Sequence, residues 1–312
     1  METQTIPASR AKWGVRSASP RGIEITPRDV TLLAHLASLR FLTSEQLGRL
    51  DGGSEQNVTR CLRALFDHGY VDQVGDPFVR RAYAITRKGA HLLQEHGHLV
   101  DPTVRWSLKN KRAGGRFIDH TLGIADVLIG MQVAYRRRGD VGFIPEHEII
   151  ANSPEATRKA REPLRWTVLG AKEKFGVSSV VADGLFGLRR ADGTASYFLL
   201  ELDRGRMPNV RRNLEQTSIG RKLALYYEGW KTNRHVELFG VKQLRIAIVT
   251  TSPARVEHMI SAVKETTGGG GSNLFLFIDR EHLAAGNPID GEWISGKGEV
   301  ARLIDRASGD LK

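Results

Sequence analysis

The sequence has one cysteine, no long apolar run and no signature of a nucleotide-hydrolysing or serine-hydrolase site. Cys61 is the only cysteine among 312 residues, which excludes an internal disulfide and a multi-cysteine zinc site. No run of 18 or more apolar residues is present, so we expect no membrane span. The patterns GxxxxGK(S/T) and GxSxG are absent, and histidines do not cluster at metal-ligand spacing. These absences favour a cytoplasmic protein that is neither an NTPase nor a serine hydrolase.

Basic residues outnumber acidic residues, and the net positive charge per residue is larger near the N-terminus. The chain has a formal net charge of +11. Residues 1–115 carry 17 Lys and Arg against 11 Asp and Glu, whereas the remaining 197 residues carry 29 against 24. A basic surface attracts polyanions such as DNA. Residues 1–25 are basic and lack an apolar core, which predicts a disordered tail instead of a secretion signal.

Residues 26–96 have the pattern of a winged helix–turn–helix domain. Thr26 and Pro27 are typical of a helix start, and leucines at helical spacing follow them. A short second helix, a tight turn and a third helix beginning at Ser54 come next, and Gly69 ends the third helix. Two short strands around residues 75–77 and a last helix after Thr86 complete the pattern.

The third helix of such a domain presents its polar face to the DNA major groove, while the hairpin contacts phosphates. Asn and Gln pair with adenine and Arg with guanine, so polar side chains on this helix are candidates for reading bases. A module for dimerisation or protein docking is the alternative interpretation. The residues predicted to contact double-stranded DNA are Gln56, Asn57, Thr59, Arg60, Arg63, Arg80, Arg81 and Lys88.

Residues 97–115 are polar and basic and are predicted to be a linker to a second domain, residues 116–312. The expected fold class is α+β, with the winged domain followed by an α/β restriction-endonuclease-like domain containing a mixed sheet. The expected elements are a helix over 117–138, strands at 142–149, 178–181, 185–189 and 197–202, a helix over 208–230, a strand at 244–250, a helix over 253–266 and a strand at 274–278. Residues 268–272 (GGGGS) fit a natural loop and an engineered linker equally well.

The stretch VVADGLFGLRRADGTASYFLLELDRG, residues 180–205, places Asp183 before one strand and Glu201 and Asp203 at the end of the next. This arrangement resembles the PD-(D/E)xK nucleases, in which carboxylates hold a divalent metal and a lysine assists the attacking water. The resemblance implies Mg²⁺ or Mn²⁺ ligands at Asp183, Glu201 and Asp203. Asp203 stands where the lysine is expected, and Lys222 is the candidate replacement as a fourth catalytic residue.

A structural role is the alternative for this acidic stretch. Asp183 would then cap a turn, and Glu201 and Asp203 would pair with Arg204, Arg206 or Arg211. In that case the nuclease-like domain is degenerate and does not cleave DNA. Glu146 and Glu148, which alternate along a predicted strand, would add a carboxylate near Asp183 if the strands are neighbours.

Several short motifs together are similar to the replication-relaxation family of bacterial plasmids and mobile elements. They are YAITRKG at 83–89, HTL at 120–122, ADG at 182–184, LELDRG at 200–205 and the pair Lys222 and Tyr226. The resemblance implies a DNA-binding protein involved in replication, relaxation or mobilisation of such an element. A relaxase, a replication protein or a second copy of the chain are the candidate protein partners. A Mg-dependent endonuclease and a transcriptional regulator that binds promoters are the alternatives.

Overall fold

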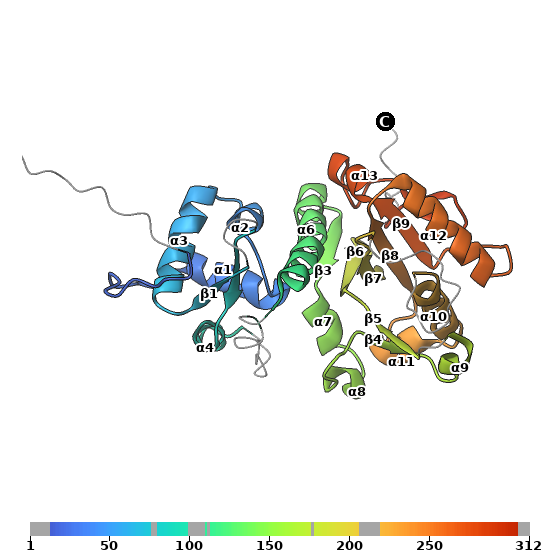
Figure 1. Cartoon of the computed structure of the whole chain (residues 1–312), viewed down its shortest axis with the longest axis horizontal. Coiled ribbons are helices and arrows are strands. Elements are labelled where there is room, and N and C mark those ends of the chain that lie inside the picture. Colours follow the sequence, from blue (N-terminus) through green and yellow to red (C-terminus); the bar gives the residue numbers. More distant parts are fainter. Residues whose placement is uncertain are drawn as a thin grey trace, which may run out of the picture. The chain divides into compact units, whose positions relative to one another are not determined.

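A computed structural model of the protein describes residues 13–75, 80–98, 110, 113–175, 178–205 and 219–304 (Figure 1). Its contacts divide the chain into two compact units, Met1–Ile129 and Gly130–Lys312. The division falls within the long helix α6 (Gly115–Arg138), whereas the sequence predicted a boundary at residue 116. The reason is that Ile118 and Leu122 at the start of α6 belong to the hydrophobic core of unit 1.

The described part of unit 1 contains three helices, a two-stranded hairpin and a fourth helix before α6, in the order that the sequence predicted. Side chains at the caps explain where the helices begin: Thr26, Thr43, Ser54 and Thr86 each accept a hydrogen bond from a backbone N–H in the first turn. The elements are α1 (Pro27–Leu39), α2 (Ser44–Asp51), α3 (Glu55–Asp67), β1 (Val71–Val74), β2 (Ala82–Ile85) and α4 (Arg87–Glu95).

Residues 13–21, which we call the N-terminal strap, pack against the rest of unit 1. The backbone N–H of Ser17 donates to Asp67 Oδ1 at 2.8 Å, and Arg16 pairs with Asp72 at 2.7 Å. The guanidinium of Arg16 also lies over the ring of Phe66, 4.4 Å from its centre. The predicted disorder of residues 1–25 is therefore wrong for the strap, and residues 1–12 lie outside the described part of the chain.

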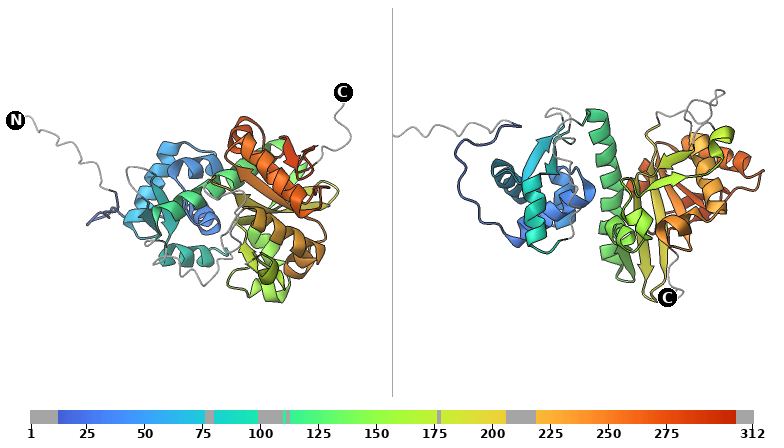
Figure 2. Two further views of the ribbon diagram at one scale, coloured as in Figure 1. Left: turned by 45° about the vertical axis from the view of Figure 1, so that its right-hand side comes forward. Right: turned by 90° about the horizontal axis from the view of Figure 1, so that it is seen from below.

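Unit 2 is built on a mixed sheet (Figure 2). Its seven strands lie in the order β11-β10-β9-β8-β7-β6-β3. Strands β7, β8 and β9 run parallel, and the pairs β3–β6, β6–β7, β9–β10 and β10–β11 are antiparallel. The strands are β3 (Val141–Ile144), β6 (Gly184–Arg190), β7 (Ala195–Leu202), β8 (Leu244–Thr250), β9 (Phe275–Asp279), β10 (Trp293–Ser295) and β11 (Val300–Ala301).

Helices α10 (Ile219–Lys231) and α12 (Pro253–Thr266) connect the parallel strands and cover one face of the sheet. Leu199, Ile248 and Phe277 point into this layer and pack with apolar residues of both helices. The opposite face carries a row of stacked rings, in which neighbouring centres lie 5.0–6.1 Å apart. The rings belong to Tyr135, Phe143, Phe186 and Phe198.

The predicted strand at 142–149 is wrong in its second half, because Pro145 ends β3 and α7 (Glu146–Ala151) follows. A separate two-stranded sheet of β4 (Arg165–Thr167) and β5 (Ser179–Val181) lies outside the main sheet. The start predicted for the helix at 208 lies outside the described residues. No element was predicted for α11 (Arg234–Phe239), α13 (Arg280–Ala285), β10 and β11. Helix α8 (Glu155–Arg158) precedes β4, and α9 (Ala171–Phe175) lies between β4 and β5.

Helix α6 is long and apolar enough to cross a membrane by length and composition alone. Within unit 1, however, Gln46 donates to the carbonyl of Leu122 at 2.9 Å and to the carboxylate of Asp126 at 2.6 Å. Apolar residues along the helix, such as Leu122 and Ile129, are fully buried in the protein. The apolar stripe of α6 is therefore accounted for by packing within the chain.

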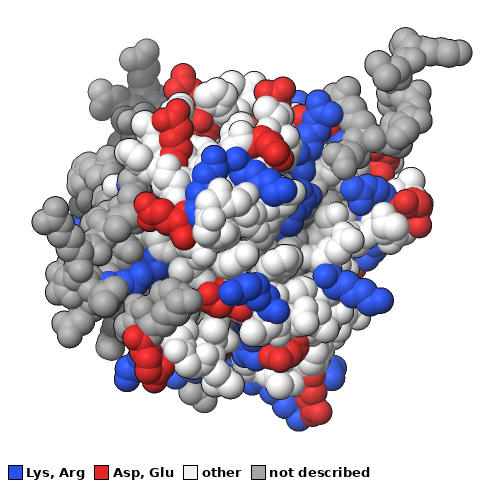
Figure 3. Space-filling model, turned by 90° about the vertical axis from the view of Figure 1, so that its right-hand side faces the viewer, with Lys and Arg blue, Asp and Glu red and all other residues white. Residues whose placement is uncertain are grey.

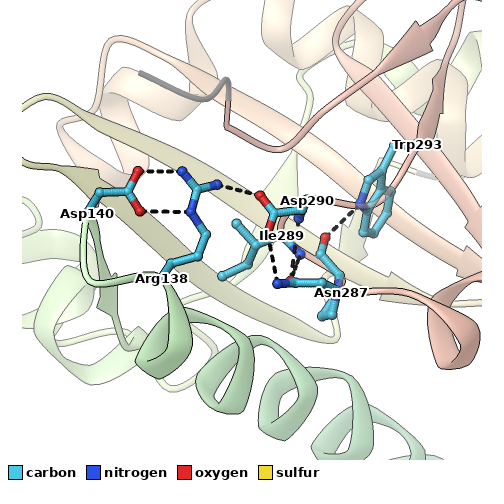
Figure 4. Close-up of polar contacts among 7 residues, drawn as sticks. Arg138, Asp140, Asn287, Ile289, Asp290 and Trp293 are labelled. Atoms are coloured by element: carbon cyan, nitrogen blue, oxygen red, sulfur yellow. Dashed lines mark hydrogen bonds and ion pairs between the residues drawn. The ribbon is translucent and has the colours of Figure 1, made fainter. Parts of the chain in front are cut away.

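The end of α6 anchors the segment between α13 and β10 (Figure 4). Arg138 donates to Asp140 and also to Asp290 at 2.7 Å, and its side chain is only 10 % exposed. Asn287 Oδ1 accepts from the backbone N–H of Ile289, which forms a tight turn. The indole of Trp293 donates to the Pro288 carbonyl at 3.0 Å. These contacts hold the short strand β10 against the edge of β9.

The GGGGS stretch is an ordered turn between α12 and β9. Gly271 has φ +67°, and a Cβ at this position would lie 2.5 Å from the carbonyl oxygen of Gly296. Its N–H donates to Thr267 Oγ1 at 2.8 Å, and Ser272 Oγ accepts from the N–H of Leu274. The close backbone approach requires glycine at 271, which favours a natural loop over an inserted linker.

We expect Gly271→Ala to lower the free energy of unfolding by about 1–3 kcal/mol, because alanine is strained at positive φ and meets the Gly296 carbonyl. Gly270→Ala is the matched control, since a Cβ there meets nothing within 4 Å and its φ is not positive. Urea unfolding of the two variants measures the difference. Equal stabilities would show that the turn does not depend on Gly271.

Candidate functional site

The first half of α3 presents a continuous polar surface. Val58 and Leu62 are fully buried against the rest of unit 1. Val58 and Leu62 are four residues apart and share the inner face of the helix, so the other side of its first half faces outward. The predicted DNA-contacting residues of this half are exposed to solvent: Gln56, Asn57, Thr59 and Arg60.

The other predicted DNA-contacting residues already have partners within unit 1. Arg63 pairs with Asp67 through two hydrogen bonds of 2.7 and 2.8 Å and also donates to the Val15 carbonyl of the N-terminal strap. Arg80 pairs with Asp126 at 3.0 Å. Lys88 donates to the His68 carbonyl at 3.0 Å and lies over the ring of Tyr70. Arg81 is exposed, and its guanidinium lies 5.5 Å from the ring centre of Trp13.

In unit 2, strand pairing brings Asp183 beside Glu201. The antiparallel register of β6 and β7 pairs Gly184 with Leu200, so its continuation places Asp183 opposite Glu201. The backbone N–H of Asp183 donates to the Leu200 carbonyl at 3.0 Å, and its Oδ2 accepts from the N–H of Leu202 at 2.8 Å. Asp183 therefore contacts the backbone on both sides of Glu201.

Two side chains from α10 bind the carboxylate of Glu201. Lys222 pairs with Oε2 and the hydroxyl of Tyr226 donates to Oε1. Glu201 is only 3 % exposed. Burial raises the pKa of Glu201 to about 7, and Lys222 acts in the opposite direction. Burial works to lower the pKa of Lys222, but the carboxylates of Glu201 and Asp183 outweigh it and raise that pKa overall.

Asp203 is bound by a different cation. Arg255, in the first turn of α12, pairs with both carboxylate oxygens, and Thr250 donates to Oδ2 at 2.6 Å. Burial acts to raise the pKa of Asp203, but the bonds from Arg255 and Thr250 overcome it and the pKa is lowered. The sequence reasoning missed Arg255 and named Arg204, Arg206 and Arg211 as candidate partners. Arg206 and Arg211 lie outside the described residues.

The arrangement does not fit the predicted metal centre at Asp183, Glu201 and Asp203. One hydrated Mg²⁺ or Mn²⁺ needs oxygen ligands that converge at about 2.0–2.2 Å. Glu201 and Asp203 instead face separate cations of the protein. Throughout the part of the chain that the structure describes, no three His, Cys, Asp or Glu side chains are gathered for one ion.

Glu146 lies near this cluster, although not on a strand as predicted. It begins α7, and its Oε2 accepts from the backbone N–H of Leu185 at 3.1 Å. Burial raises the pKa of Glu146 to about 7, which the hydrogen bond from Leu185 only partly offsets. Glu148 does not share this position and pairs with Arg189 at 3.0 Å.

The charges on the side of the molecule that includes α12 are mixed. In Figure 3, Lys and Arg side chains alternate with Asp and Glu over the visible face. Such a face has no extended field of one sign, and a polyanion is attracted chiefly by such a field.

The fold and the cluster define an α+β protein with a mixed sheet whose buried carboxylates are neutralised by its own lysine and arginine. The chain belongs to the replication-relaxation family, whose model matches residues 33–241, more than half of the sequence. This match confirms the resemblance and indicates a role in replication or relaxation of mobile elements. The matched range includes Glu201 and Lys222 but ends before Arg255. No curated protein sequence matches the chain.

Glu146 and Glu201 are expected to make stability depend on pH. A carboxyl group whose pKa is higher in the folded chain binds its proton more tightly there. The free energy of unfolding should therefore fall as pH rises from about 4.5 to 7 and then level off. Glu146→Gln should reduce this decline by about 1–3 kcal/mol, as measured by urea unfolding at a series of pH values. Glu148→Gln is the control, and a decline of the same size in all three proteins would contradict the assignment.

Proposed function

We propose that the protein binds duplex DNA with unit 1 during replication or relaxation of a bacterial mobile element. The observation that carries this proposal is the exposed polar surface on the first half of α3. Asn and Gln can each make two hydrogen bonds to adenine, and Arg can do the same to guanine. A helix–turn–helix reads base edges with the N-terminal residues of its second, recognition helix, which α3 would be here.

The β1–β2 hairpin would act as the wing. Arg81 at the start of β2 is exposed and is suited to a phosphate contact. Arg80 and Lys88 would contribute only after exchanging their present partners for phosphate, because both are bonded within unit 1.

Unit 2 would serve as a nuclease-like platform that does not cleave DNA and that docks a relaxase, a replication protein or a second copy of the chain. What supports this part of the proposal is the pairing of Glu201 with Lys222 and of Asp203 with Arg255. Both carboxylates are thereby neutralised without a metal.

Substitutions in α3 and in the hairpin should affect DNA binding differently. Asn57→Ala and Arg60→Ala should reduce discrimination between sequences by about 1–3 kcal/mol for each lost base contact. Arg81→Ala should weaken binding to all sequences and reduce the slope of log K against log salt concentration by about 1, because a phosphate contact releases counterions. Gel-shift titrations at several salt concentrations measure both effects.

Arg158→Ala is the matched control, since Arg158 is an exposed arginine of α8 in unit 2. It should leave both affinity and salt dependence unchanged. If Asn57→Ala, Arg60→Ala and Arg81→Ala all bind DNA like the unsubstituted protein, unit 1 is a docking module and the proposal fails.

We also expect no nicking of supercoiled plasmid by the purified protein, with or without Mg²⁺ or Mn²⁺. Nicking that requires the metal and is abolished by Glu201→Gln, while DNA binding persists, would instead identify a metal-dependent endonuclease. Agarose gels of relaxed and supercoiled plasmid distinguish the two outcomes.

A further inference from the structure

A carboxylate on α6 is shared by two arginines from different elements of unit 1. Asp126 lies in the part of α6 that belongs to unit 1. Its Oδ2 accepts from Arg80, two residues before β2, at 3.0 Å. Its Oδ1 lies 3.9 Å from the guanidinium of Arg49, in the last turn of α2. The single negative charge of Asp126 therefore faces two positive charges, and one positive charge is in excess.

The Asp126 carboxylate is held in place by a buried amide. Gln46 of α2 is only 2 % exposed. Its Nε2 donates to Asp126 Oδ1 at 2.6 Å and to the Leu122 carbonyl at 2.9 Å. Its Oε1 accepts from the backbone N–H of Thr43 at 2.9 Å. Because both ends of the amide are bonded, Gln46 has a fixed orientation and presents Asp126 to the two arginines in one position.

The two ion pairs of Asp126 are accessible to water and can be exchanged at low cost. The side chains of Arg49, Arg80 and Asp126 are 44 %, 35 % and 41 % exposed. Exposed ion pairs of this kind contribute little to stability. A phosphodiester offers anionic oxygens to the same guanidinium groups, and its binding also releases counterions from DNA. A DNA backbone phosphate is therefore the class of ligand that competes with Asp126 for both arginines.

We propose that Arg49 and Arg80 form a binding site for a backbone phosphate of DNA, and that Asp126 occupies this site when DNA is absent. Asp126 is then a built-in competitor of DNA. Phosphate contacts carry no sequence information, so this competition lowers the affinity for all sequences alike. Arg49 becomes a DNA-contacting residue outside both the recognition helix and the wing. The inference rests on the proposed binding of DNA by unit 1.

The test measures binding of the full-length protein to a DNA duplex of mixed sequence by fluorescence anisotropy at several salt concentrations. Asp126→Asn removes the negative charge and keeps the oxygen that accepts from Gln46. It should bind about three to ten times more tightly at low salt. It should also steepen the slope of log K against log salt concentration by about 1–2, because each released arginine can contact a phosphate.

Glu24→Gln is the matched control, because it also removes one negative charge from unit 1. Glu24 is exposed and lies in the segment before α1. This variant should keep the affinity and the salt dependence of the unsubstituted protein. An equal gain in Glu24→Gln and Asp126→Asn would show that net charge alone is responsible and would overturn the inference.

Arg49→Ala and Arg80→Ala locate the gain in affinity. Each should cause a loss about threefold larger in the Asp126→Asn protein than in the unsubstituted protein, where Asp126 already limits the contact. Equal losses in the two backgrounds would overturn the inference, and so would an Asp126→Asn protein that binds no more tightly than the unsubstituted one. The proposed function still holds in these cases if Asn57→Ala and Arg60→Ala reduce discrimination. If no variant binds DNA, the proposed function and this inference fail together.

Discussion

The buried carboxylate of Glu201 sets the main constraint on unit 2. A charge with 3 % exposure is tolerated in a protein interior only when it is paired and hydrogen-bonded. Lys222 and Tyr226 meet this requirement, and because both come from α10, the same contacts fix that helix on β7. Removing one partner of a buried pair typically costs about 3–5 kcal/mol, since the other is left uncompensated. The helix that carries the chain from β7 to β8 is therefore positioned by polar as well as apolar contacts.

Glu201 and Asp203 have opposite pKa shifts although they are two residues apart. Glu201 lies within the layer between sheet and helices, where burial dominates and the pKa rises. Asp203 lies just beyond the end of β7, where Arg255 and Thr250 bind its carboxylate and the pKa falls. Thr250 ends β8 and Arg255 begins α12, so Asp203 joins the carboxyl ends of two parallel strands to the following helix. Glu201 thus binds helix α10 to β7, whereas Asp203 binds the start of α12 to the ends of β7 and β8.

The sequence predicts most of the fold because caps and apolar periodicity are local signals. The bounds of β8 and α12 agree with the predicted 244–250 and 253–266. Arg255 was missed as the partner of Asp203 because 52 residues separate them, and only the parallel pairing of β7 and β8 brings them together. The strand predicted for 142–149 was wrong beyond Pro145, because polar and apolar residues can also alternate over the first turn of a helix. The resemblance to the replication-relaxation family rested on short sequence motifs, so errors in the predicted helices and strands did not affect it.

The N-terminal strap limits which part of α3 is available to the DNA that we propose it binds. Its contacts involve Arg63, Phe66 and Asp67, all in the second half of the helix. Asp67 bonds Arg63 and also the backbone of Ser17, so an arginine that the sequence assigns to DNA is used to fasten the strap. The exposed polar residues of α3 are left at its N-terminal turns, the part of a recognition helix that reaches base edges. Whether an arginine of α3 is available to DNA therefore depends on its partners within the chain. Arg63, in the second half of the helix, already binds Asp67 and the strap.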